Sequence, residues 1–181
     1  MTTEVTSTPL RVLFVCTANI CRSPHMELTA RALAGEGSGL TFASAGTRGF
    51  HETPMDTVMA GTLPVGSAAS FRSRRLDARV LAEADVVLTA EASHRAQILE
   101  EHPHLVRSVF TLGQLYVALE RDPDLRGRAL LEAVARRRTP ARAADDVEDP
   151  YRRGVAAAEA AAGRISTMLS VIVPRLQEAD R

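Results

Sequence analysis

Hydrophobic residues in this chain fall into short continuous runs that alternate with segments of helical periodicity. Runs rich in Val, Leu and Phe are typical of strands buried on both faces, and such runs predict four strands, at 11–16, 40–47, 85–90 and 108–115. Apolar residues at helical spacing predict helices at 24–34, 76–84, 91–101, 115–138 and 156–178, the fourth interrupted by Asp122 and Pro123. Strands that alternate with helices favour a parallel sheet, so we expect an α/β domain whose four-stranded sheet is covered by helices on both faces.

Turn-forming and capping residues refine these boundaries. Ser23 suits the N-cap of the first helix, Pro24 suits its first turn and Gly35 suits its C-cap. The stretch 48–70 is rich in Gly, Thr, Pro and Ser and predicts a long loop with one short helix near 55–60. Pro174 is expected to kink the last helix or to end it early.

The length of 181 residues favours one domain. Residues 1–9 are small and polar and predict a disordered leader, which places the folded domain at 10–181. The N-terminus lacks the basic and apolar segments of a secretory signal, and no apolar run approaches the roughly 18 residues of a membrane span. We therefore expect a cytoplasmic protein with no membrane partner.

Charge and cysteine content exclude several classes of function. The 22 basic and 22 acidic residues cancel, which argues against nucleic acid or an anionic membrane as partner. The two cysteines, Cys16 and Cys21, are too few for a disulfide framework or a four-cysteine zinc site. The histidines show no metal-ligand spacing either, so we expect neither a metal nor a cofactor.

The segment with clear chemical meaning is CTANICRSP, residues 16–24, between a predicted buried strand and a helix N-terminus. A tight loop in this position presents successive backbone N–H groups to an oxyanion, and the helix dipole adds positive potential. Arg22 can close the ring, because a guanidinium grips two oxygens at once. A thiol in such a field ionises readily, so Cys16 is a candidate nucleophile toward a bound phosphate.

These features together resemble the low-molecular-weight protein tyrosine phosphatase family. The shared signature is C-x5-R-S-P, and the second family motif, Asp-Pro-Tyr, is present at 149–151. Weaker similarities are SAGT (44–47), DVVLTAEASH (85–94) and VFTLGQL (109–115), in the family's order. The resemblance covers most of residues 10–178 and implies a flavodoxin-like, doubly wound fold.

The resemblance also implies a role for each residue of the loop. Cys16 would form a phosphocysteine, and Arg22 would hold the transferring phosphoryl group. Ser23 would hydrogen-bond the thiolate, and Asn19 would shape the loop in a left-handed conformation. The other loop residues expected to contact the substrate are Thr17, Ala18, Ile20 and Cys21.

A proton donor for the leaving group is expected in the second motif. The resemblance implies that Asp149 protonates the phenolate and then activates water, which are general acid and general base roles. Asp122 also precedes a proline, but only Asp149 is followed by a tyrosine, so Asp149 is the better candidate. Tyr151 is expected either to form a wall of the pocket or to pack beneath the loop. Asp145, Asp146 and Glu148 are expected only to solvate the loop.

We therefore predict a phosphatase that hydrolyses phosphotyrosine on proteins, as a monomer or weak homodimer. Three alternatives stay open. Phosphoarginine phosphatases share the loop but typically have a Thr where this chain has Ile20. Arsenate reductases of this fold use further cysteines, although a variant that uses a low-molecular-weight thiol needs none. A catalytically weak phosphate-binding protein is suggested by Ala18, where the family usually has Gly, and by Phe71, near the place of a family His.

Two further features of the sequence concern regulation and packing. Cys21 lies five residues after Cys16 in the same loop, so a disulfide between them could protect an oxidised Cys16. The family resemblance supports such a redox switch, and the alternative is a small side chain that packs beneath the loop. An Arg- and Ala-rich helical insertion at 121–142 has no function assigned from its sequence.

Overall fold

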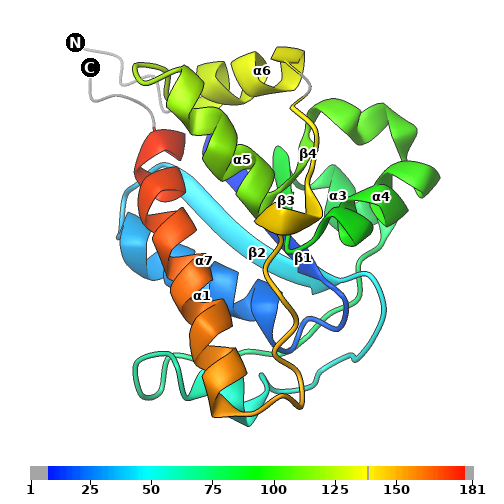
Figure 1. Ribbon diagram of the computed structural model, residues 1–181, viewed down its shortest axis with the longest axis vertical. Helices are drawn as coiled ribbons and strands as arrows, with labels where there is room; N and C mark the ends of the chain where they lie inside the picture. The colour runs from blue at the N-terminus through cyan, green and yellow to red at the C-terminus, as the bar shows by residue number, and fades with distance from the viewer. Residues whose placement is uncertain (1–7, 138, 178–181) are drawn as a thin grey trace.

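The computed structural model describes residues 8–137 and 139–177 (Figure 1). The predicted leader lies almost entirely outside the described residues, with only its last two positions inside them. Four parallel strands form one sheet in the order β2-β1-β3-β4. They are β1 (Leu10–Cys16), β2 (Leu40–Gly46), β3 (Val86–Thr89) and β4 (Val109–Thr111). The predicted α/β fold with a four-stranded parallel sheet is confirmed.

Helices cover both faces of the sheet and divide its core in two. The larger apolar cluster joins the sheet to α1 (Arg22–Ala34), α5 (Leu112–Ala118), α6 (Gly127–Arg137) and α7 (Val155–Leu176). The short helix α2 (Thr57–Ala60) adds to this cluster through Met59. On the opposite face, α3 (Ala78–Ala82) and α4 (Ala92–Glu101) pack on the smaller cluster. Single 3-10 turns occupy Pro103–Arg107, Leu119–Arg121 and Ala143–Asp145.

The alternation of inward residues along β1 explains why this strand is central. Val12 and Phe14 point into the larger cluster, whereas Leu13 and Val15 belong to the smaller one. Each of these four side chains is at most 2% exposed. A strand buried on both faces requires neighbours on both sides, and β1 pairs with β2 and β3.

Helix α7 is long and apolar enough to span a membrane by length and composition, which the sequence reading did not anticipate. One side of it is instead buried in the larger core cluster. Ile165, Leu169 and Ile172 are fully buried, as their spacing requires for a core face. Pro174 does not end the helix early, since it continues to Leu176.

Two predicted boundaries were wrong for reasons of capping. The fourth strand stops at Thr111 because the Thr111 side chain accepts from the backbone N–H of Gln114, and the Gln114 side chain accepts from the backbone N–H of Thr111. This capping box starts α5 at Leu112, inside the predicted strand. Helix α1 begins at Arg22 with Cys21 as its N-cap, so Ser23 is not the cap and its hydroxyl is free for another contact.

The insertion at 121–142 contributes to the core. Its helix α6 buries Leu130 and Val134 in the larger cluster, beside α7. Asp122 forms an ion pair with Arg137, which closes the turn before α6 onto the end of that helix. Asp122 is therefore a structural turn residue, as its lack of a following tyrosine suggested.

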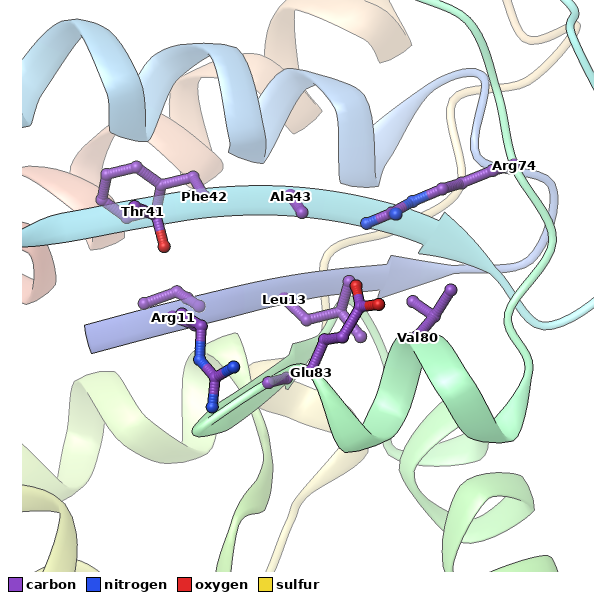
Figure 2. Close-up of a pocket in the computed structure, with 10 residues that line it drawn as sticks. Arg11, Leu13, Thr41, Phe42, Ala43, Arg74, Val80 and Glu83 are labelled. Carbon is purple, nitrogen blue, oxygen red and sulfur yellow. The ribbon is translucent and has the colours of Figure 1, made fainter. Parts of the chain in front are cut away.

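Strand β2 forms one edge of the sheet, and two arginines bind its outer side. Arg31 from α1 donates to the carbonyl oxygen of Phe42 at 2.9 Å, and Nε of Arg74 donates to that of Ser44 at 2.8 Å. Figure 2 shows Arg74 reaching back along β2, above a shallow groove of about 190 Å³ between β1, β2 and α3. The groove has Arg11 at its other end and Glu83 at the C-cap of α3, and no residue of the 16–24 loop lines it.

We predict that Leu169→Ala lowers the free energy of unfolding by about 2–5 kcal/mol, because it empties a fully buried site in the core. Urea denaturation followed by circular dichroism measures the change. Val171→Ala on the same helix is the control, since Val171 is 40% exposed, and its effect should stay within about 0.5 kcal/mol. Equal effects of the two substitutions would show that α7 does not pack as described.

Candidate active site

The loop Cys16–Ser23, called the phosphate loop below, lies at the carboxyl end of the parallel strands. This edge is where open α/β sheets place their ligands. Backbone hydrogen bonds tie the loop to the following segments: Thr47 donates to Cys16 O at 2.9 Å, Arg48 to Thr17 O at 2.8 Å and Asp56 to Ile20 O at 2.8 Å. The loop is therefore held from outside through its carbonyl groups.

The N–H groups of the same loop are not used in this way. From Thr17 to Cys21, none of the backbone N–H groups donates to another of the described residues. A run of unpaired donors at the start of a helix is the arrangement that binds an oxyanion. The loop can thus bind a phosphate-like group through its backbone.

Cys16 lies at the base of the loop, 3% exposed, with its sulfur 3.0 Å from the hydroxyl oxygen of Ser23. The side-chain amide of Asn19 donates to that hydroxyl at 2.9 Å. The proton of Ser23 is then free to point at the sulfur or at the more distant Ala45 carbonyl, 3.4 Å away. Ser23 is placed to donate a hydrogen bond to a thiolate at Cys16.

Asn19 organises the back of the loop. It has a positive φ of 55°, the left-handed conformation expected from its sequence position. Its amide also donates to Ser44 Oγ at 2.8 Å, and its carbonyl oxygen accepts from the backbone N–H of Arg74 at 2.9 Å. Ser44 donates in turn to the buried carboxylate of Glu27 at 2.5 Å. This network supports the loop although Phe71 stands near the place of the family His.

Ala18 fits the loop because the facing residues are glycines. A Cβ atom on Gly46 would lie 2.7 Å from Thr17 O, and one on Gly49 would lie 2.9 Å from the Cα of Ala18. Ala18 itself is not among the residues with positive φ. The substitution of Ala for the usual Gly at this position therefore imposes no left-handed strain.

The guanidinium of Arg22 is 2% exposed and has partners from two other segments. Nη1 donates to the carboxylate of Glu91 and to Val147 O, the latter at 2.9 Å, and Nη2 lies 3.2 Å from Asp149 Oδ2. Nε is buried and has no partner among the described residues. Because a buried donor needs an acceptor, Nε is available to an oxygen of a bound oxyanion.

Glu91 was missed as a site residue by the sequence reading, which placed it only at a helix start. Burial raises the pKa of its carboxyl group, but the hydrogen bond and charge of Arg22 outweigh this and lower that pKa below its usual value. Glu91 therefore remains ionised beside the guanidinium. Its position directly after a buried parallel strand was the available signal.

The second motif lies at the mouth of the site. The side chain of Asp149 is 49% exposed, and its Oδ1 accepts from the backbone N–H of Tyr151 at 3.2 Å. Tyr151 is exposed, with the guanidinium carbon of Arg152 5.1 Å from the centre of its ring. Its exposure argues against packing beneath the loop, and its role as a pocket wall stays a prediction.

Among the residues expected only to solvate this loop, Asp146 was read incorrectly. Its Oδ1 accepts from the backbone N–H of Ala92 at 2.8 Å and so caps α4. Glu148 is exposed and pairs with Arg153 at 3.3 Å, as a solvated residue does.

Two histidines, His25 and His94, are buried. His94 is 4% exposed, and its Nε2 lies 2.8 Å from Thr17 Oγ1. Burial and the nearby charge of Arg22 lower the pKa of His94 to about 4, so its ring is neutral at physiological pH. His25 is 1% exposed inside α1, and burial lowers its pKa to about 4 as well. Neither belongs to a metal-binding cluster: within 8–137 and 139–177, no group of three or more possible ligands occurs.

Cys21 and Ile20 occupy the inner side of the loop, 4% and 7% exposed. Burial, followed by the charges of Asp56 and Cys16, raises the pKa of the Cys21 thiol to about 12. Cys21 is therefore protonated at neutral pH, and the redox switch with Cys16 stays a prediction. Both cysteines are free in this structure.

The family model for low molecular weight phosphotyrosine protein phosphatases matches residues 11–136. The chain belongs to this family. Among its relatives, the phosphatase Wzb of Salmonella typhi is 32% identical over 127 residues, which cover 68% of this chain and 83% of Wzb.

Solved structures of similar fold include phosphatases of two substrate classes. A low molecular weight protein tyrosine phosphatase from T. tengcongensis is 26% identical. The match covers 92% of the present chain and 99% of the T. tengcongensis chain, with a TM-score of 0.72. The YwlE arginine phosphatase of Geobacillus stearothermophilus is 23% identical, with 93% of each chain covered and a TM-score of 0.74. Wzb from Escherichia coli K30, solved in complex with phosphate, has 20% identity, coverages of 92% and 97%, and a TM-score of 0.67. The last two likenesses show the fold alone.

Proposed function

We propose that this member of the family hydrolyses phosphotyrosine on proteins through a phosphocysteine intermediate. The observation that carries the proposal is the juxtaposition at the loop: the Cys16 sulfur is 3.0 Å from Ser23 Oγ, below unpaired backbone N–H groups and the unpaired Nε of Arg22. The proposed nucleophile and the oxyanion site therefore lie in the same loop. Phosphate and phosphate esters fit such a site.

Each group has a defined part in the proposed reaction. The Cys16 thiolate attacks phosphorus and displaces the tyrosine oxygen, which receives the proton of Asp149. Arg22 and the loop N–H groups hold the three transferring oxygens and stabilise their charge. Asp149 then takes a proton from water, which attacks the phosphocysteine and releases phosphate and the Cys16 thiolate. The Ser23 hydroxyl favours this departure by hydrogen-bonding the sulfur.

Hydrolysis of phosphoarginine is the second candidate, because the YwlE arginine phosphatase shares the fold. The side chain at position 20 argues for tyrosine. Ile20 is an apolar side chain, 7% exposed in the loop, and it suits a phenyl ring better than a guanidinium, which requires hydrogen-bond acceptors. Two other candidates are less supported. A thiol relay would need more than the two cysteines of the chain, and a weak binding protein would not need the Ser23 hydroxyl at the Cys16 sulfur.

We predict that Cys16→Ser abolishes turnover of p-nitrophenyl phosphate, because the hydroxyl of serine is a far weaker nucleophile than a thiolate. Vanadate or phosphate should still bind, since the oxyanion contacts come from the backbone and Arg22. Steady-state kinetics and isothermal titration measure the two effects. Turnover near the wild-type rate in this variant would contradict a phosphocysteine mechanism.

We predict that Asp149→Asn slows hydrolysis of phenyl phosphate by about 10²–10⁴-fold, the usual contribution of general acid catalysis. The loss should be smaller for p-nitrophenyl phosphate, because its more acidic phenol leaves with less help. The kcat/KM values of the two substrates, compared with those of the wild type, measure this difference. If both substrates lose equally, another group is the acid.

We predict that Ile20→Thr raises kcat/KM for phosphoarginine relative to phosphotyrosine by about tenfold, since an apolar wall discriminates by amounts of this order. Ile20→Val is the matched control and should leave the ratio unchanged. Competition between the two substrates in one assay gives the ratio directly. An unchanged ratio in Ile20→Thr would place the specificity-determining wall elsewhere.

A further inference from the structure

The segment Asp145–Asp149, called the acid strap below, is attached to the sheet before it reaches the site. The backbone N–H of Val147 donates to Ala90 O at 2.9 Å, and Val147 is fully buried. At the start of the strap, the carbonyl oxygen of Asp145 would lie 2.1 Å from a Cβ atom on Gly113. The strap therefore packs directly on the starts of α4 and α5, and Asp149 stands at its far end.

Helix α4 lacks the cap that its own sequence would provide. Its N-cap residue is Glu91, whose side chain makes no capping hydrogen bond. The carboxylate of Glu91 instead accepts from Arg22 and from the hydroxyl of Ser93. The backbone N–H of Ala92 donates instead to Asp146, which lies 54 residues further along the chain. Helix α4 is thus capped by the acid strap.

The contacts of Arg22 give this cap a consequence for the active site. One nitrogen, Nη1, donates both to Glu91 at the start of α4 and to Val147 O in the strap. The bond between Asp146 and Ala92 joins those same two segments. The contacts of Arg22, Glu91, Ala92, Asp146 and Val147 form a closed ring. In this ring the bond from Ala92 to Asp146, together with the backbone bond from Val147 to Ala90 O, holds the two partners of Arg22 near each other.

We propose that Asp146 is a positioning residue: by capping α4 it holds the Arg22 guanidinium and the Asp149 carboxylate in register with each other. Asp146 touches neither the thiol nor the oxyanion site in the described contacts, so it acts through the strap. Its burial, together with the charges of Glu91 and Asp145, raises the pKa of Asp146. The side chain of Asp146 is therefore harder to ionise here than in water, and the hydrogen bond from Ala92 N–H partly offsets this effect.

The test compares Asp146→Ala with the wild type, and it rests on the function proposed above. Loss of the cap should lower kcat/KM for phenyl phosphate by about 10- to 100-fold, as expected when a catalytic group is misplaced by about 1 Å. The loss should be smaller for p-nitrophenyl phosphate, because the displaced group is the acid. Vanadate affinity should fall too, since Arg22 loses its register. In an Asp149→Asn background, the effect of Asp146→Ala on phenyl phosphate should shrink.

The controls separate positioning from stability. Asp77 caps α3, accepting from Val80 N at 2.8 Å, on the helix that packs on the smaller core cluster. Asp77→Ala removes a comparable cap and should change neither the leaving-group dependence nor vanadate affinity. Asp146→Asn keeps the accepting oxygen and should restore most of the activity. If Asp146→Ala does not fold, Asp146→Glu, which lengthens the side chain by one methylene, should show the same leaving-group-dependent loss.

Several results would overturn the proposal. They are rates for Asp146→Ala within twofold of the wild type, an equal loss for both phenols with unchanged vanadate affinity, or the same pattern in Asp77→Ala. A wild-type protein that turns over neither ester would instead refute the proposed function. In that case vanadate affinity and hydrogen exchange at the Ala92 amide still test the ring of contacts.

Discussion

Burial of the Arg22 guanidinium is the constraint on which the site depends. An ion removed from water costs several kcal/mol unless it is paired and hydrogen-bonded, and the side chain of Arg22 is 2% exposed. Its partners come from two distant parts of the chain: Glu91 follows the third strand, and Val147 and Asp149 lie beyond the inserted helix. The fold must bring both segments to one end of β1 before the arginine can be buried. The arrangement of the sheet and the geometry of the site therefore depend on each other.

Near Cys16, the phosphate loop also depends on a strained group that hydrogen bonds stabilise, here the left-handed Asn19. A left-handed asparagine costs roughly 1–2 kcal/mol, and Asn19 offsets this with three side-chain hydrogen bonds, to Ser23, Ser44 and the backbone of Arg74. Those bonds connect the surroundings of the Cys16 sulfur to the edge strand and to the buried Glu27. Because the network continues to a buried carboxylate, the loop keeps its shape without the histidine usual in the family.

The sheet and the phosphate loop could be predicted from the sequence, because buried strands and the C-x5-R-S-P spacing are local signals. Contacts between residues far apart in the sequence could not be predicted in this way. The local pattern indicated a helix cap at Ser23, and only the family resemblance implied that its hydroxyl contacts the Cys16 sulfur, as it does. Glu91 and Asp146 were read as a helix start and a solvated loop residue, since neither of their partners is near in sequence. The fourth strand was predicted too long because apolar residues continue across the capping box at Thr111.

The two arginines that bind the outer side of β2, Arg31 and Arg74, affect how readily the molecule aggregates at high concentration. A strand at the edge of a sheet offers free backbone groups to any other strand, which is how sheets propagate from one molecule to the next. Here the outward carbonyls of Phe42 and Ser44 already accept from Arg31 and Arg74. An incoming strand would have to displace two charged side chains, one of which also pairs with Glu27. The edge is thus protected against self-templated aggregation by residues of the same network that supports the phosphate loop.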